Sequence, residues 1–497
     1  MPQVLARDAM AFVEVIGRQY LGQASHHLDF DWVAGGPTLV AGWSFDGASL
    51  SVSADRLGFI PLFYAREGRR LIVADSLQEA AARLSAPAFD DEAIAVFMAL
   101  GYLVGAQTPL AGVKVLMPGE TLLWREGVLS GERPAIPLTP PFSGDPHEAR
   151  TRFTELFARA IERRAAGGVG RLPLSGGRDS RHICLELAQQ DTPPPRTLVL
   201  RAKRGDESGV ACTVARHLGI ECQVIDNPQD RIAAERQKNR LNHYSTDENS
   251  WYLALMPHLE GPVFDGLAGD VLCNGSYFDA RLAECLGAGD LEGAANRVLM
   301  AGSYTSFLKR TFQDRWRLQI ARDAIIRELG AHVGTPDPAK SFVFWNRIRR
   351  EIALLPIAMA GQQQAVCLPY QDPDVLEFLL SLPWQSFATR AFHDEVIRSC
   401  YPHAAHIPYS QKATGSPPRV EWASLGRRVS HLARPLFNAF TRPERVVGYA
   451  LEALRTGHIR PLTPTFVKVM PLLQAVQELG VDPHRHQAAA YPAGKAA

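Results

Sequence analysis

Cysteine is scarce in this chain: it has seven in 497 residues, and none comes before Cys184. The cysteines follow no Cys-x-x-Cys spacing and no disulfide pattern, so neither structural zinc nor a disulfide framework is expected. Because free thiols persist in a reducing compartment, this usage indicates the cytoplasm.

An excess of one charge and long apolar runs are also lacking. Lys and Arg number 53 against 52 Asp and Glu, which gives no electrostatic reason to expect nucleic acid or a membrane surface as a partner. No segment approaches the ~20 apolar residues of a membrane span. Residues 1–21 mix charges into a modest predicted helix without the apolar centre of a signal peptide. The length favours two domains plus an extension.

A P-loop is absent, since no Gly-Lys-Ser/Thr follows the glycines of the most informative loop. That loop reads Ser175-Gly-Gly-Arg-Asp-Ser180, between a short apolar run and a helical pattern. Its glycines allow close approach of a ligand, and its amides with the following helix N-terminus form an anion cradle. Asp179 would repel phosphate unless a divalent cation lay between them, which predicts a Mg²⁺ ligand. A glycine-rich turn in an ordinary α/β domain is the alternative.

The surrounding pattern predicts a doubly wound parallel sheet. Apolar residues repeat at helical spacing over 153–161, 183–188 and 210–218, and short apolar strands are expected at 197–200 and 222–225. Such alternation is typical of an α/β domain. Ligands of such sheets bind outside the carboxyl ends of the strands, where the loop after Leu174 would lie.

A second loop, Pro262 to Leu272, has a strand-like start, two glycines and Asp270. Mg²⁺ typically takes one or two carboxylates and completes its shell with phosphate oxygens and water. Asp179 and Asp270, at two strand ends, are therefore expected to hold Mg²⁺ on the phosphates of ATP. A solvated aspartate in a glycine-rich turn is the alternative.

These motifs, in this order, resemble the synthetase domain of B-type asparagine synthetase and its relatives, the β-lactam synthetases and lasso peptide cyclases. Ser175 to Ser180 matches the family's Ser-Gly-Gly-x-Asp-Ser loop, and Gly266 to Asp270 matches its second loop loosely. Three further segments correspond: Glu207 to Ala215 to an acidic residue and Ala-x-x-x-Ala helix, Leu368 to Phe378 to a Pro-x-x-Asp segment, and Gln411-Lys412 to a Gln-Lys element. The resemblance implies an adenine nucleotide α-hydrolase-like domain that cleaves ATP to AMP and pyrophosphate.

The N-terminal part resembles a class II glutamine amidotransferase domain. Asp55 to Tyr64, Val73 to Ser76, Gly101-Tyr102, and Leu110 to Leu122 carry this likeness. Glutaminases of this class use a cysteine at position 2 as an N-terminal nucleophile, but Pro2 stands here. Without a thiolate no thioester intermediate forms. We therefore expect an amidotransferase-like β-sandwich that does not hydrolyse glutamine.

The resemblance also assigns site residues. Ser175, Gly176, Gly177, Asp179, Ser180, Val199 and Gly266 are expected to bind ATP or its pyrophosphate, Asp179 and Asp270 to hold Mg²⁺, and Lys412 to act with both aspartates in catalysis. Gln362 to Gln364 and the arginines Arg347, Arg349 and Arg350 either line a substrate pocket or form a solvated helix face.

Three positions depart from the family. Leu267 stands where asparagine synthetases carry a glutamate base, Val271 replaces the acid after the family aspartate, and Arg178 occupies a position that is more often apolar. Glu248, His243 and Tyr252 are candidates for the missing base. Otherwise the nucleophile arrives neutral, or the enzyme stops at adenylation or is inactive.

The expected organisation is an amidotransferase-like domain over 1–134, a linker over 135–146, the synthetase domain over 147–430, and a helical extension with a disordered tail over 431–497. The expected activity is an ATP-dependent ligase that joins a small-molecule or peptide carboxylate to an amine, as β-lactam or lasso cyclases do, with a homodimer allowed. The alternatives are a catalytically weak nucleotide-binding protein and an ammonia-dependent asparagine synthase. An ATP pyrophosphatase that thiolates tRNA would need a basic surface or catalytic cysteines.

Overall fold

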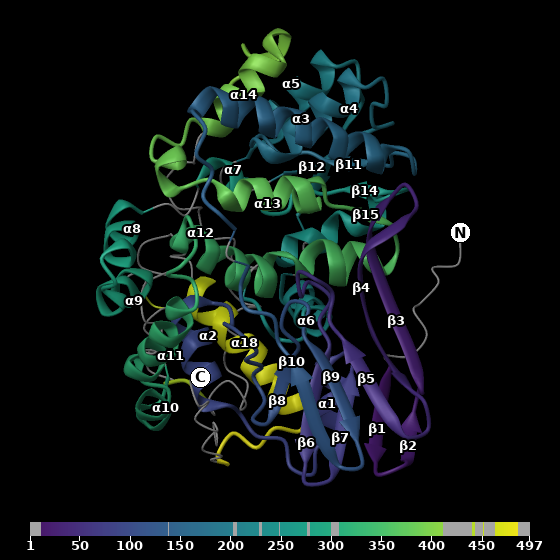
Figure 1. Cartoon of the computed structure of the whole chain (residues 1–497), viewed down its shortest axis with the longest axis vertical. Helices are drawn as coiled ribbons and strands as arrows, with labels where there is room; N and C mark the ends of the chain where they lie inside the picture. The colour runs from purple at the N-terminus through teal and green to yellow at the C-terminus, as the bar shows by residue number, and fades with distance from the viewer. Residues whose placement is uncertain are drawn as a thin grey trace.

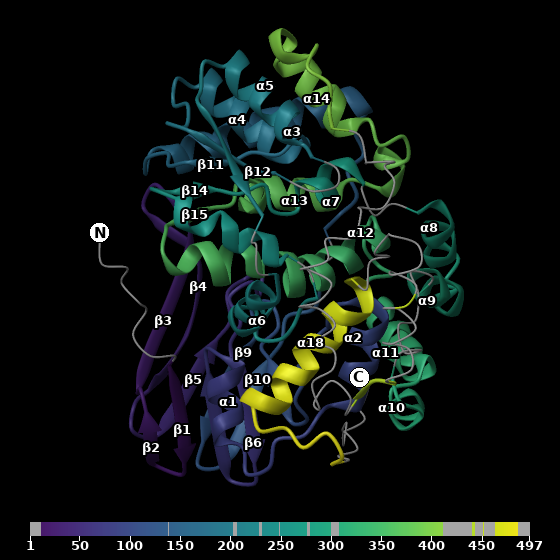
Figure 2. The same ribbon diagram turned by 180° about the vertical axis from the view of Figure 1, so that it is seen from behind.

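The structure is a computed structural model, and Figures 1 and 2 show its arrangement from opposite sides. Of the side chains, those of residues 231, 232, 362 and 463–468 are not described. The described residues are 11–137, 139–201, 206–227, 231–247, 249–275, 279–299, 308–410, 440–442, 451 and 463–485.

The N-terminal region is built from antiparallel strands. They are β1 (Phe12–Ile16), β2 (Gln19–Gly22), β3 (Ser25–Val33), β4 (Gly36–Phe45), β5 (Ser49–Ser53), β6 (Phe63–Glu67), β7 (Arg70–Ala74), β8 (Val113–Val115), β9 (Thr121–Arg125) and β10 (Val128–Glu132). One sheet has the order β2-β1-β7-β6-β8 and the other β10-β9-β5-β4-β3. Their buried residues, among them Val13, Trp43 and Trp124, belong to one core. Two helices, α1 (Leu77–Arg83) and α2 (Asp91–Leu100), accompany the sheets.

The helix expected within residues 1–21 is wrong for the residues described there, because 12–16 and 19–22 form β1 and β2. Val13 and Val15 are fully buried while their neighbours are more exposed. This alternation has the period of a strand rather than a helix, and β-branched side chains favour the strand.

The second region alternates parallel strands with helices, as expected. Its central elements are α3 (Pro146–Ala165), β11 (Leu172–Pro173), α4 (Asp179–Gln189), β12 (Thr197–Arg201), α5 (Ser208–His217), β13 (Cys222–Asp226), α6 (Arg231–Leu241), β14 (Val263–Phe264), α7 (Gly269–Asn274), β15 (Val366–Cys367), α13 (Pro373–Ser381) and α14 (Phe392–Cys400). The proline-rich stretch before α3 ends at Asp145, which caps the helix together with Glu148. The predicted mixed α/β fold is thus confirmed.

The helices between residues 280 and 343 lie on the left of Figure 1, and the helix over 463–478 lies beside α6 in both views. No helix of the described residues is long and apolar enough to span a membrane. The bounds are α8 (Ala280–Gly287), α9 (Leu291–Leu299), α10 (Arg310–Arg315), α11 (Leu318–Gly330), α12 (Pro338–Val343), π-helical turns at Phe344–Ile352 and Leu355–Met359, and α18 (Thr463–Glu478).

Across the sheet of the second region, the strands that follow β11 in the sequence lie on both sides of it. Hydrogen bonds pair β11 with β12 and β12 with β13, and separately β14 with β15. The residues leading into β11 and β14 are bonded to each other, Gly170 N to Pro262 O and Arg171 N to Glu260 O, both at 2.9 Å. The order is therefore β13-β12-β11-β14-β15, with a switch point between β11 and β14 where such sheets bind ligands.

The cysteine expectation needs one correction. Cys212 of α5 and Cys222 of β13 form a disulfide, with their Cα atoms 5.3 Å apart. They are ten positions apart in the chain and are joined by the second half of α5 and the turn before β13. No sequence pattern marks the pair because the close approach depends on how α5 packs on its own sheet.

Candidate functional site

The first loop, residues 175–178, joins β11 to α4 and is held by its own side chains. The Ser175 amide donates to Ser180 Oγ at 3.0 Å, and the Gly177 amide donates to Ser175 Oγ at 3.1 Å. The Gly176 amide donates to a carboxylate oxygen of Glu207 at 3.0 Å. A carboxylate of the protein thus accepts from a loop amide, and an anion bound at this amide would have to displace it.

Gly266 and Gly269 allow the second loop to pack closely against Asp179. A Cβ on Gly266 would lie 2.9 Å from Asp179 Cβ, and one on Gly269 only 2.6 Å from Asp179 Cγ. Since Cβ atoms do not approach so closely, any larger residue would push Asp179 away from the second loop. The two loops, 91 positions apart between Asp179 and Asp270 in the sequence (270 − 179), therefore meet at the switch point.

Asp179 and Asp270 lie in the first turns of α4 and α7. Burial, and next the Asp270 carboxylate, raise the pKa of Asp179 well above its usual value, against a hydrogen bond from the Asp270 amide. Asp179 Oδ1 is buried without a hydrogen-bond partner among the described residues. Two coupled carboxylates with an unsatisfied oxygen fit Mg²⁺, which selects oxygen ligands.

Among the described residues, Asp179 forms no ion pair with a lysine or an arginine. His393 of α14 has Nδ1 3.5 Å from Asp179 Oδ1, but burial lowers the pKa of this histidine to about 3, so the ring is neutral. The described residues contain no cluster of three or more His, Cys, Asp or Glu that would bind a metal. A cation here would complete its shell with phosphate oxygens and water.

Asp265, directly after β14, is a third carboxylate of the site that sequence reasoning missed. Burial raises its pKa to about 6, against hydrogen bonds from the Leu267 amide and the Tyr252 hydroxyl. The Tyr252 hydroxyl lies 3.4 Å from Asp265 Oδ2. In the sequence, the one sign of Asp265 as a site residue was its position at the carboxyl end of a predicted strand. Of the proposed bases, Tyr252 thus belongs to the site, with its own pKa raised by burial.

Residues 407–410 cross the first loop. The Ser410 amide donates to Gly176 O at 3.1 Å, and a Cβ on Gly176 would meet Ser410 Oγ at 2.7 Å. Arg181 donates to Ile407 O and Pro408 O. Lys412, two positions beyond Ser410, lies outside the described residues.

Arg178, the unusual residue of the first loop, pairs with Asp394 of α14. Its guanidinium lies over the Tyr409 ring at 4.4 Å, and that of Arg181 over the same ring at 4.2 Å. Cation–π contacts of this kind stabilise a neighbouring segment. Arg178 therefore fastens residues 407–410 to the loop.

Three other predicted positions are buried. Leu267 is 2% exposed, Val199 in the middle of β12 is also 2% exposed, and Tyr370 is fully buried. The Tyr370 hydroxyl lies 3.3 Å from Asp179 O and 3.4 Å from His393 Nε2. Leu267 and Tyr370 thus pack within the protein around the loops and expose almost no surface to a substrate.

The arginine run serves neither of its expected roles. Arg349 and Arg350 are 1% and 4% exposed and both donate to Gly105 O of the N-terminal region. Arg347 pairs with Glu351 at 3.1 Å. Arg349 and Arg350 also line a cavity of about 10 Å³, room for about one water.

Of the remaining base candidates, His243 contacts the N-terminal region. His243 also lines that cavity and accepts from the Leu77 amide at 3.4 Å, and burial lowers its pKa to about 4. Glu248 lies outside the described residues. Of the expected pocket glutamines, Gln364 donates to Leu259 O at 3.4 Å.

Comparison with known proteins identifies the N-terminal region. Residues 36–133 match the family model described as a glutamine amidotransferase domain. Curated protein sequences yield no significant match. The N-terminal region is therefore of the glutamine amidotransferase type, which indicates an enzyme of the transferase or ligase kind.

Two solved structures are similar to part of this chain. One is titled the structure of the allosteric regulatory enzyme of purine biosynthesis; it is 14% identical, with 38% of this chain and 47% of that chain covered and a TM-score of 0.14. The other is glutamine phosphoribosylpyrophosphate amidotransferase from B. subtilis complexed with ADP and GMP; it is 16% identical, with 37% and 47% covered and a TM-score of 0.13. The chain spans about half the length of these structures.

Proposed function

We propose that the chain is an ATP-dependent amide-bond-forming ligase of the asparagine synthetase type, releasing AMP and pyrophosphate and hydrolysing no glutamine. The observation that carries the proposal is the meeting of two strand–loop–helix units at the switch point. They place Asp179 and Asp270 at adjacent helix N-termini, with an unsatisfied Asp179 oxygen between the loops. Mg²⁺ bound there would neutralise the pyrophosphate leaving group.

In the first step a substrate carboxylate oxygen attacks the α-phosphorus of ATP, and the bond to the β-phosphate oxygen breaks. The loop of residues 175–178 would orient the departing pyrophosphate through its amides and the Ser175 and Ser180 hydroxyls, with Glu207 displaced from the Gly176 amide. Gly266 provides the close approach of the second loop. Lys412 is assigned to the same charge on the resemblance of Gln411-Lys412 to the Gln-Lys element of the family.

In the second step an amine attacks the acyl carbon and AMP leaves. The proton of the amine passes to Asp265, which replaces the acid missing at Leu267. This assignment is supported by its place beside that residue at the end of β14 and by its raised pKa of about 6. The acceptor is an amine on the acid itself or on a second organic molecule, as in relatives that lack the glutaminase nucleophile.

The test is pyrophosphate release from ATP with candidate amino acids and peptides, in the wild type and in Asp179→Asn. The substitution removes one carboxylate from the pair proposed to hold Mg²⁺ and should abolish turnover, while the melting temperature stays within a few degrees. Asp191→Asn, an exposed aspartate just beyond α4, is the matched control and should behave as the wild type. Full activity of Asp179→Asn would overturn the metal assignment.

A nucleotide-binding protein with little turnover is the second candidate. The observation in its favour is that the amides of residues 175–177 are already bonded within the protein and that Leu267 and Tyr370 are buried. The same experiment separates the two, since this candidate binds Mg²⁺-ATP without releasing pyrophosphate for any acid.

A further inference from the structure

The β3–β4 hairpin of the N-terminal region reaches the parallel strands of the second region. In Figure 1 it runs upward until its tip lies at the level of β14 and β15. There the Ala34 amide donates to Arg163 O of α3 at 3.0 Å, and Cys367 of β15 donates its thiol to Trp32 O at 3.7 Å. The β3–β4 hairpin thus joins the amidotransferase-like region to α3 and β15 of the second region.

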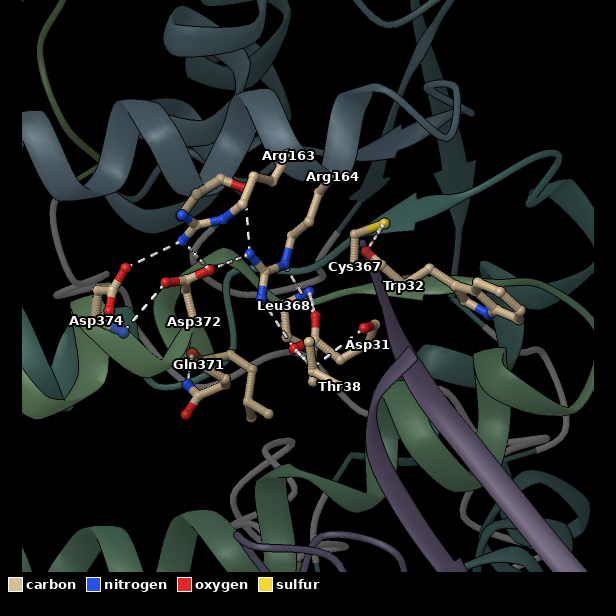
Figure 3. Close-up of polar contacts among 12 residues, drawn as sticks. Asp31, Trp32, Thr38, Arg163, Arg164, Cys367, Leu368, Gln371, Asp372 and Asp374 are labelled. Carbon is tan, nitrogen blue, oxygen red and sulfur yellow. Dashed lines mark hydrogen bonds and ion pairs between the residues drawn. The ribbon is translucent and has the colours of Figure 1, made fainter. Parts of the chain in front are cut away.

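Asp31 of β3 is the centre of the junction, as Figure 3 shows. It is fully buried, and Arg164 of α3 donates to both its carboxylate oxygens at 2.9 Å. The Leu368 amide donates to Asp31 Oδ1 at 2.9 Å. The Asp31 backbone has a φ of 60°, a left-handed conformation that the Thr38 hydroxyl supports by donating to Asp31 O at 3.1 Å.

Arg164 also connects Asp31 to the segment after β15. Its Nη1 donates to Asp372 Oδ2 at 2.8 Å, and Arg163 donates to the same oxygen at 2.6 Å. A buried ion pair of this kind gives little net stability because of its desolvation cost, and its best-attested use is to specify one geometry. Here the geometry that it specifies is that of residues 368–372.

Residues 368–372 in turn contact both loops of the candidate site. The Gln371 side-chain amide donates to Leu267 O of the second loop at 2.8 Å, and the Tyr370 hydroxyl donates to Asp179 O at 3.3 Å. From the N-terminal region, Arg56 Nη2 donates to Gln371 O at 2.6 Å. One segment of five residues therefore lies between the N-terminal region and the two carboxylate-bearing loops.

We propose that the amidotransferase-like region is retained as a positioning scaffold, with Asp31 and Arg56 holding residues 368–372 and thereby the spacing of the Asp179 and Asp270 loops. The inference rests on the proposed function for its catalytic consequence. Asp31, Arg56 and Gln371 are positioning residues, since none of them is assigned a contact with ATP. Loss of this support would allow the loops to separate and would weaken the binding of Mg²⁺ and ATP together.

The experiment compares the full-length wild type with Arg56→Met and Gln371→Met. Arg56→Met removes the guanidinium that donates to Gln371 O, together with its charge, and Gln371→Met removes the side-chain amide that donates to Leu267 O. Arg125→Met is the matched control, because this arginine is exposed on β9 of the same region. Hydrogen exchange of residues 175–180 and 265–270 is measured without ligand, and the Kd of Mg²⁺-ATP by calorimetry. Both variants should exchange faster in these loops and bind Mg²⁺-ATP roughly 10–100-fold more weakly, the range for residues that support metal ligands.

The double variant tests whether Arg56 acts through Gln371. The effects of the two substitutions should be smaller in combination than their sum, because both interrupt one connection. Unchanged exchange in Arg56→Met and Gln371→Met would overturn the scaffold, whatever the wild type binds. A wild type that binds no Mg²⁺-ATP would instead overturn the proposed function, while the exchange data still decide the scaffold. If Arg56→Met unfolds, Thr38→Val, which removes the hydroxyl that donates to Asp31 O, tests the N-terminal side of the junction by the same exchange measurement, and unchanged exchange overturns the scaffold.

Discussion

At the scale of residues, the fold places the carboxyl groups of the site close together and buries them, and both effects raise the pKa of a carboxyl group. Burial and Asp270 raise the pKa of Asp179, and burial raises that of Asp265 to about 6. Perturbed carboxylates gather at functional sites more often than elsewhere, because catalysis needs groups that titrate near neutral pH. The two have separate roles in the proposal, Asp179 with the cation and Asp265 with the proton.

Asp265→Asn tests the second role. The amide accepts no proton, so the rate of the amine step should fall about 10²–10⁴-fold, the usual contribution of a general base. The wild-type rate should rise as pH passes through about 6, because the base works deprotonated. The measurement is the pH profile of amide formation against that of pyrophosphate release. A variant that keeps the wild-type profile would remove Asp265 from the mechanism.

At the scale of elements, several hydrogen bonds join α18 to α6, and Glu478 accepts the charged ones. Glu478 accepts from Arg236 at 2.9 Å, Arg240 at 2.7 Å and Tyr244 at 2.9 Å. Burial favours the neutral acid, but hydrogen bonds from Arg240, Gln474 and Tyr244 outweigh it and lower the pKa of Glu478 to about 2. The ionised form therefore stabilises the contact between the helices.

The predicted pH dependence follows from that lowered pKa. A carboxylate whose pKa is lower in the folded protein stabilises it above its unfolded pKa of 4.5, and this contribution is lost as pH falls toward 2. Glu478→Gln should cost on the order of 1 kcal/mol at pH 7, since the group is partly exposed. Thermal melts at pH 7 and pH 3 should show the wild-type advantage shrinking on acidification. A difference that is equal at both values would contradict the ion-pair explanation.

At the scale of the whole molecule, an amidotransferase-type region and a parallel-strand region share a polar junction. Asp31, Arg164 and Asp372 form its buried centre, and Arg349 and Arg350 bind the carbonyl of Gly105 nearby. Residues 1–183 contain no cysteine. We therefore expect this junction to position the second region, and we expect no ammonia from glutamine to pass through it.

The corresponding prediction is that glutamine yields no glutamate and does not support ligation. Glutamate is measured enzymatically after incubation with ATP, Mg²⁺ and glutamine, and the same mixture with a substrate amine is the positive control. Glutamate formed in proportion to AMP would show that another nucleophile operates. Asparagine formed from aspartate and ammonia at ordinary rates, roughly 1–10³ s⁻¹, would contradict an organic amine as the acceptor.

The sequence alone determined the local elements of the site. The apolar spacing before and after Ser175 to Ser180 predicted α3, α4, β12, α5 and β13, because side-chain periodicity reflects which face of each element is buried. The glycines and aspartates of the two loops likewise marked the strand ends at which ligands of such sheets bind.

Tertiary structure decided which distant groups meet. Three contacts join positions more than a hundred residues apart. They are Asp31 with Arg164, Asp179 with His393, and Gly105 with Arg349. Asp265 shows the same limit: its residue type and place were legible, but its raised pKa depends on burial among neighbours from other elements. Periodicity records only whether a residue is buried, and its partner is chosen when the sheets and helices pack.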